Sequence, residues 1–287
     1  MEPLPTDVSR LIERRLARTR QLIQNSDVVH VSFPKSGKTW VRWFLQAYYE
    51  AADGVPFELG SSRIAGRSLP SVVFTEDFFN VYADVPVEPR VLFQDLLDDK
   101  RVIVLVRDPR DIVVSYYHWA RARLIDDPAR PRPFLDVSSL NRFIRSDVYG
   151  IERIAKYLGL LMDYAESRSA DTMLVSYERL HDNRWAEFAT LVQFITSDTS
   201  SDALTEALER ASFEAMQRRE VEISQGGDAA NYRRVGVEDW DGDFNSLKVR
   251  RGEVGGFRAE MGLRSRIQVL ASRPVRKVVR RLDQPLW

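Results

Sequence analysis

The run Val102–Val106 is the feature that most constrains the fold. All of its residues are apolar, and no polar residue alternates with them. A strand of this kind is buried on both faces, as in a parallel sheet covered by helices. Three further, largely apolar runs have strand length: Val28–Phe33, Val72–Thr75 and Met173–Val175. Patterns of helical periodicity follow closely after at least three of the four runs, so we predict an α/β layered domain with a central parallel sheet flanked by helices.

The chain has 287 residues, of which 44% are hydrophobic, so it is long enough to bury a sizeable core. No repeat or linker divides it, and we interpret residues 1–287 as one domain. Apolar residues recur with helical spacing over residues 6–25, which predicts an amphipathic helix within an N-terminal segment, residues 1–26. Two stretches, 125–137 and 224–247, are rich in turn-forming residues and are predicted to be long loops.

Charge is balanced overall but unevenly placed. The chain has 42 basic and 42 acidic residues, which disfavours bulk attraction to nucleic acid or to an anionic membrane. Residues 248–287 nevertheless carry eleven basic and three acidic residues. Part of this positive charge lies in a basic C-terminal extension, residues 264–287, for which the sequence indicates no function.

Cysteine is absent, which excludes disulfides, thiolate metal sites and a cysteine nucleophile. With only three histidines, we expect no metal site. The missing cysteines favour a reduced, cytoplasmic protein. No N-terminal stretch has the layout of a signal peptide, and the apolar runs are far shorter than a membrane span.

The first candidate site follows the run Val28–Phe33. Pro34, the segment Lys35–Thr39 and a helical pattern from about Trp40 form a strand, a turn and a helix. The N–H groups of such a turn point outward at a helix N-terminus, where they bind anions. Lys35 and Lys38 add positive charge, while Ser36 and Thr39 add hydroxyl donors around Gly37. This combination indicates phosphate binding.

A Walker A loop is one reading of this turn. Gly37, Lys38 and Thr39 match the end of that motif, but Ser32 stands where its first glycine belongs. Pro34 also removes an N–H donor from the loop. A P-loop kinase or NTPase is therefore the second reading.

The second candidate site follows Val102–Val106. Arg107 is the first residue past the expected carboxyl end of this strand, which is where open α/β sheets bind ligands. Asp108 and Pro109 suit a turn and a helix start, and Ser115 lies about two turns into that helix. An arginine and a serine in these places suit a charged and a neutral contact to phosphate.

Both segments resemble the sulfotransferases that use 3′-phosphoadenosine 5′-phosphosulfate (PAPS). The stretch Phe33–Trp40 is similar to that family's 5′-phosphosulfate loop at six of eight positions, with Phe33 for a tyrosine and Lys38 for a threonine. The stretch after Val106 is similar to its 3′-phosphate motif. The resemblance implies a P-loop-NTPase-like layered fold and a cytosolic-type, bacterial sulfotransferase. Lys38, Thr39 and the loop amides would then hold the 5′-phosphate, and Arg107 and Ser115 the 3′-phosphate. Trp40 would stack near the adenine, although it is equally suited to the core.

Three more segments extend the resemblance. Tyr177, in the stretch 174–180, matches a tyrosine that contacts adenine, and Ser212, Phe213 and Met216 match a segment packed on the same nucleoside. The late motif contributes the basic pair Arg250 and Arg251 with Gly252, which would close on the 3′-phosphate. In the second half of the motif, Gly256, Phe257 and Arg258 stand where the family has aspartate, tryptophan and lysine.

The resemblance implies in-line transfer of a sulfuryl group from PAPS to an acceptor, with release of 3′,5′-ADP. The expected acceptor group is a hydroxyl, with an amine as the second choice. Lys35 would neutralise the charge that develops on the bridging oxygen. Cytosolic members use a histidine as base, but His30, His118 and His181 all lie elsewhere and are interpreted as structural. Glu76 follows the run Val72–Thr75 where that histidine belongs, and we predict it as the base, with Asp77 as the alternative.

The acceptor is expected to be a small molecule or a glycan, bound by the variable stretches 54–70, 123–147 and 224–247. The sequence does not determine the oligomeric state, and a homodimer is one possibility.

A third reading of the function is a non-catalytic protein that binds a nucleotide, or that docks residues 264–281 on an acidic partner or a lipid surface. A P-loop enzyme normally needs Mg²⁺ and an acidic residue at a strand end, where this chain has Arg107.

Overall fold

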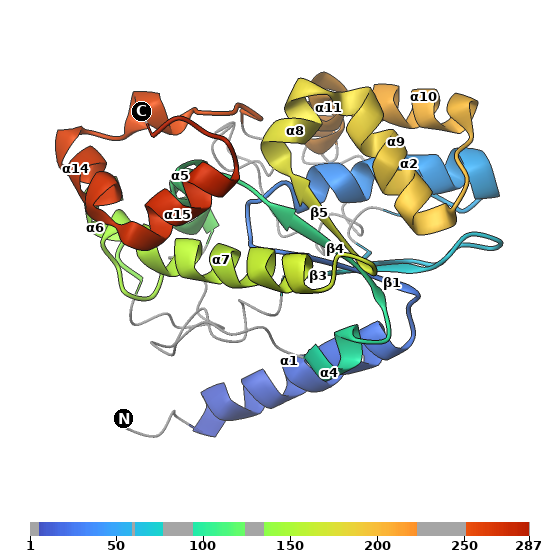
Figure 1. Cartoon of the computed structure of the whole chain (residues 1–287), viewed down its shortest axis with the longest axis horizontal. Coiled ribbons are helices and arrows are strands. Elements are labelled where there is room, and N and C mark those ends of the chain that lie inside the picture. Colours follow the sequence, from blue (N-terminus) through green and yellow to red (C-terminus); the bar gives the residue numbers. More distant parts are fainter. Residues whose placement is uncertain (1–5, 59–60, 77–93, 124–134, 223–250, 287) are drawn as a thin grey trace.

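The computed structural model describes residues 6–58, 61–76, 94–123, 135–222 and 251–286, without the side chains of 6–12, 15 and 123. Helices and strands alternate through the first two thirds of the chain, and helices alone follow (Figure 1). The elements are α1 Thr6–Gln24, β1 Val28–Ser32, α2 Lys38–Asp53, β2 Arg63–Ile64, β3 Val72–Thr75, α4 Gln94–Leu97, β4 Arg101–Val106, α5 Pro109–Arg123, α6 Leu140–Ile144, α7 Ile151–Ser167, β5 Thr172–Ser176, α8 Tyr177–Asp182, α9 Arg184–Thr196, α10 Ser201–Arg210, α11 Phe213–Glu222, α13 Phe257–Glu260, α14 Leu263–Ala271 and α15 Arg273–Arg281.

The sheet has the order β2-β3-β1-β4-β5. Four strands are parallel, with Val29 opposite both Val73 and Val102, and Val104 opposite Leu174. The short strand β2 pairs antiparallel with β3 at the edge and was not predicted from the sequence. All four predicted strands are confirmed, and the predicted α/β class with a mostly parallel sheet is confirmed with them.

β4 separates two hydrophobic cores. Val102, Val104 and Val106 belong to the core beneath α5, α7 and α15, while Ile103 and Leu105 belong to the core beneath α2, α9 and α10. All five residues are fully buried. Because side chains alternate along a strand, burial on both faces is why β4 carries no polar residue.

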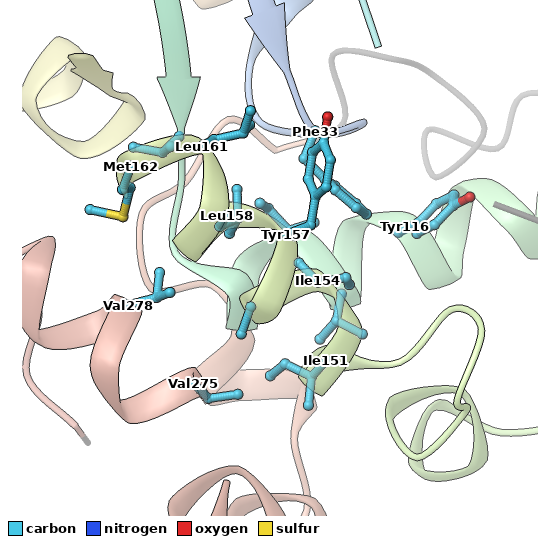
Figure 2. Close-up of a cluster of buried hydrophobic side chains, with 14 of the residues drawn as sticks. Phe33, Tyr116, Ile151, Ile154, Tyr157, Leu158, Leu161, Met162, Val275 and Val278 are labelled. Atoms are coloured by element: carbon cyan, nitrogen blue, oxygen red, sulfur yellow. The ribbon is translucent and has the colours of Figure 1, made fainter. Parts of the chain in front are cut away.

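The predicted N-terminal helix is confirmed as α1, which contacts β3 and α4. The basic segment after residue 263 packs against the domain by one face: Figure 2 shows Val275 and Val278 of α15 directed toward Ile151 and the rest of α7. Phe33, the residue after β1, packs edge-on against Tyr157 of α7, with ring centroids 5.8 Å apart. Figure 2 shows both residues in this core. The start of the loop after β1 is thereby fixed in the core.

The carboxyl ends of β1, β3, β4 and β5 lie at one edge of the sheet, because these strands are parallel. From β1 the chain continues to strands on one side of the sheet, and from β4 it continues to β5 on the other side. The position between β1 and β4 is therefore a topological switch point, where such sheets bind ligands. Within the described ranges, no helix is both long and apolar enough to cross a membrane.

Candidate active site

The turn between β1 and α2 is tightly built. Lys35 and Gly37 both have a left-handed backbone, with φ angles of 70° and 105°. A Cβ on Gly37 would lie 2.5 Å from Cδ2 of Tyr177, so the turn needs glycine for its backbone angle and for the approach of this ring. Helix α2 begins at Lys38 with no acidic residue in its first turn and no side-chain cap. Its N-terminus therefore retains donors for an anion.

Two buried donors at this turn have no hydrogen-bond partner among the described residues. They are Oγ of Ser36, whose residue is fully buried, and Nε of Arg107. Buried polar groups normally find a partner, and a bound anion would supply an acceptor for both. Thr39 lies half-buried in the first turn of α2. The donors present at the turn are therefore those that a phosphate group requires.

Lys38, the first residue of α2, forms an ion pair with Glu76, the residue that follows β3. Nζ of Lys38 lies 2.9 Å from Oε1 of Glu76, and each side chain is about one fifth exposed. Arg42, one turn further along α2, donates to the carbonyl of Ser61, and burial lowers its pKa. The predicted phosphate ligand and the predicted base thus lie in contact. Asp77 lies outside the described residues.

Arg107 connects the two candidate phosphate sites. Its Nη1 donates to the carbonyl of Lys35 at 3.3 Å, and its Nη2 donates to the carbonyl of Glu253 at 2.8 Å. Its guanidinium lies over the ring of Tyr177, 4.1 Å from the centroid. One arginine therefore contacts the loop after β1, the residue after β5 and the segment after residue 251.

Asp111 anchors the segment after Gly252, a role that sequence reasoning missed. Its carboxylate accepts hydrogen bonds from the N–H groups of Gly255 at 2.7 Å and Phe257 at 3.0 Å, and lies 3.9 Å from Arg107. Burial raises the pKa of Asp111, and Arg107 opposes this shift. Sequence spacing gave no sign of this role, because Asp111 and Gly255 are 144 positions apart in the chain.

Glu178 is the second residue that the sequence did not single out. Its Oε1 accepts the N–H of Asp108 at 2.8 Å, which joins the end of β4 to the start of α8. Its Oε2 is buried without a partner among the described residues, and burial raises the pKa of Glu178 to about 7. This contact holds the turn that carries Arg107.

The residues predicted to contact adenine gather around Tyr177. Trp40 meets its ring edge-on, with centroids 5.6 Å apart, and Trp40 Nε1 donates to the carbonyl of Ala211. The hydroxyl of Tyr177 donates to the carbonyl of Gly252 at 3.0 Å. A Cβ on Gly252 would lie 2.6 Å from Cδ2 of Phe213, so Phe213 packs directly on this glycine.

Other predicted residues have local structural partners. Ser212 accepts the N–H of Ala215 at the start of α11, and Met216 is buried in the core beside α2. Ser115 lies half-buried on α5, one turn beyond Asp111. Arg251 is 3.3 Å from Glu260. Arg250 lies outside the described residues, as does all of the predicted loop 224–247.

The three histidines predicted to be structural lie in different surroundings. His30 is fully buried within β1, where burial lowers its pKa to about 3. His118 on α5 contacts Glu260. His181 lies 3.2 Å from the Tyr177 hydroxyl, and burial lowers its pKa. Lys35, the lysine predicted to be catalytic, has its Nζ atom over the ring of Trp119, 5.9 Å from the ring centroid.

A family model of the sulfotransferase domain matches residues 25–261, a range that includes every element of the site. The chain belongs to the sulfotransferase family. This confirms the resemblance found in the sequence and identifies the chain as a sulfotransferase enzyme.

Curated relatives agree with this assignment. Human sulfotransferase 2B1 is 23% identical over 239 residues, which is 75% of this chain but only 58% of that relative. Human sulfotransferase 2A1 is 22% identical over 253 residues, covering 80% of this chain and 82% of the relative. Cytosolic sulfotransferase 1 of Danio rerio is 24% identical over 251 residues, covering 81% and 76%.

Solved structures share the fold. Mouse sulfotransferase SULT7A1 complexed with PAP superposes with a TM-score of 0.57 at 17% identity, covering 89% of this sulfotransferase and 88% of that chain. Retinol dehydratase in complex with androsterone and inactive cofactor PAP gives a TM-score of 0.58 at 17% identity, covering 93% and 85%. The predicted layered fold is confirmed by these neighbours.

Proposed function

We propose that this chain transfers a sulfuryl group from PAPS to an acceptor hydroxyl and releases 3′,5′-ADP. The observation that carries the proposal is the contact of Arg107 with the carbonyl of Lys35. It places the donors of the β1 turn beside those at the end of β4, so that one ligand with two phosphate positions would reach both. Two of the solved neighbours were crystallised with PAP, which supports PAPS as the co-substrate.

In this proposal the chain holds the donor with charge and with N–H groups. Lys38, Thr39, Ser36 and the N–H groups at Gly37 would bind the 5′-phosphate. Arg107, Ser115, the pair Arg250 and Arg251, and Gly252 would bind the 3′-phosphate. Tyr177, Trp40, Phe213, Met216 and Ser212 would surround the adenine.

Lys35 would bind the oxygen that bridges phosphorus and sulfur. As the sulfur–oxygen bond to this oxygen breaks, negative charge develops there, and an ammonium group stabilises it. The sulfuryl group passes in line to the acceptor oxygen, and the electron pair of the broken bond stays with 3′,5′-ADP. Positioning and charge stabilisation supply most of the rate, as in phosphoryl transfer.

Glu76 would accept the proton of the acceptor hydroxyl. It follows β3 directly at the carboxyl edge of the sheet, as a base for this site must. Its Oε1 lies 2.9 Å from Nζ of Lys38, so the proposed base is in contact with a residue proposed to bind the 5′-phosphate. The acceptor is proposed to be a small molecule or a glycan. A cytoplasmic location and a homodimer remain predictions.

Thermal unfolding in the presence of nucleotides tests the proposal. We expect 3′,5′-ADP to raise the unfolding temperature without metal, because it would occupy both phosphate positions. ATP with Mg²⁺ should shift it less. Stabilisation by ATP with Mg²⁺ alone would overturn the proposal in favour of a kinase or NTPase. Transfer of radiolabelled sulfate from PAPS to a panel of phenols, alcohols, amines and sugars then identifies the acceptor.

A further inference from the structure

Helix α14 exposes a row of apolar side chains. Leu263, Ile267 and Leu270 are 74%, 59% and 38% exposed, and they are three of the five large hydrophobic residues found exposed in the described part of the chain. Their spacing places them on one face of the helix. Ser265 and Val269, on the opposite face, are buried. The apolar row therefore points away from the domain.

Arginines flank this row on both sides. Arg264 and Arg266 are exposed and, at helical spacing, lie on opposite sides of the apolar row. Arg266 donates to the carbonyls of Met261 and Arg258, which holds its guanidinium beside the end of α13. Arg264 makes no hydrogen bond or ion pair with the described residues. An apolar strip bordered by cations is the pattern of a helix that lies in a membrane interface.

Helix α15, which follows α14 directly in the chain, carries a basic row. Only Ser272 separates α14 from α15, and Arg273, Lys277 and Arg280 are exposed on one face of α15. Val275, Val278 and Val279 on its other face are buried in the core. Lys277 lies 3.7 Å from Asp163 of α7, whereas Arg273 and Arg280 have no acidic partner in the described ranges. Residues 263–281 contain seven basic residues and no acidic residue.

We propose that α14 and α15 form a docking surface for an anionic lipid membrane. Leu263, Ile267 and Leu270 would enter the interface, and the flanking and following arginines would contact lipid phosphates. The apolar row and the unpaired arginines are the two features that such a surface complements. The overall neutrality of the chain does not oppose this binding, because the positive charge is concentrated on these two helices.

Vesicle flotation with the full chain tests the proposal without any need for turnover. We expect binding to vesicles of phosphatidylcholine mixed with phosphatidylserine, little binding to phosphatidylcholine alone, and weaker binding as salt is added. The triple change Leu263→Ser, Ile267→Ser and Leu270→Ser should abolish binding. Changing Arg264, Arg273 and Arg280 to Gln should weaken it by about fivefold per arginine.

Matched controls lie on α9, at the other end of the molecule in Figure 1. Trp185, which is 54% exposed, is changed to Ser, and the exposed Arg184 is changed to Gln. Both should leave vesicle binding and the unfolding temperature unchanged. All replaced side chains are exposed, so the variants should fold. Equal binding to both kinds of vesicle overturns the proposal. It is also overturned if the parent protein binds no vesicles and forms a dimer that the triple serine variant does not form.

Discussion

Lys38 and Glu76 form an ion pair of 2.9 Å between the first turn of α2 and the end of β3. The two residues were assigned separately from the sequence, one to the phosphosulfate and one to the acceptor. Their contact means that a ligand on Lys38 changes the electrostatic surroundings of the proposed base. Co-substrate binding and proton transfer are therefore expected to depend on one another.

Glu76→Gln should reduce turnover by about 10²–10⁴-fold, because the amide cannot accept the acceptor's proton. Affinity for 3′,5′-ADP should be kept or increased, because Lys38 loses the carboxylate that competes with the phosphate for its ammonium group. Sulfuryl transfer rates and nucleotide titration measure the two quantities. Glu214→Gln, an exposed change on α11, is the control. Turnover that stays at the parent level would refute the assignment of Glu76 as base.

Lys38→Thr, which restores the residue typical of the resembling loop, should weaken 3′,5′-ADP binding by about tenfold through the lost charge. Combined with Glu76→Gln, its effect on the free energy of unfolding should be less than additive, because both changes break the same ion pair. Calorimetric titration and denaturant unfolding report the two effects. Lys156→Thr, an exposed change on α7, serves as control. Strictly additive losses would mean that the pair contributes nothing in solution.

Gly37→Ala should destabilise the fold by about 1–3 kcal/mol, since its φ of 105° is strained for alanine. The new Cβ would also displace the ring of Tyr177, so binding of 3′,5′-ADP should be lost. Gly262→Ala is the matched control, because a Cβ there meets nothing within 4 Å. Thermal unfolding and nucleotide titration separate the two variants. Equal behaviour of both would show that the turn tolerates a side chain.

Asp111→Asn should lower stability by about 1–3 kcal/mol, because each carboxylate oxygen accepts one backbone N–H and one of these oxygens would become an NH2 donor. The segment at Gly255 and Phe257 would lose its anchor, so the KM for the sulfuryl donor should rise while the KM for the acceptor stays near its parent value. Asp99→Asn, an exposed change in the turn before β4, should be neutral. Steady-state kinetics with each substrate varied provides the measurement. A rise in the acceptor KM alone would contradict this role.

Glu178 should make stability depend on pH. Its pKa is about 7 when folded against 4.5 when unfolded, so the folded state holds an extra proton between these values. The free energy of unfolding should therefore fall as pH rises from 4.5 to about 7, by roughly 3 kcal/mol at most. Glu178→Gln does not titrate, so urea unfolding of the variant should lack this decline. Parallel pH profiles of parent and variant would rule the effect out.

The sequence alone determined the four parallel strands and the turn after β1. Val102–Val106 had to be buried on both faces because it has no polar side, and the structure buries it between two cores. The glycine, lysines and hydroxyls around Gly37 lie within a few residues of one another, so their shared position at a helix N-terminus follows from local geometry. For the same reason Arg107 could be placed at a strand end in advance.

Only the tertiary structure decided how the separate motifs meet. Asp111 and Gly255 are 144 positions apart, and the hydrogen bond that joins them exists only after α5 and the late segment have packed together. The ion pair of Lys38 with Glu76 likewise depends on the parallel pairing of β1 with β3. Local patterns report which backbone a segment adopts, whereas contacts between distant side chains depend on strand order and helix packing, which no short segment encodes.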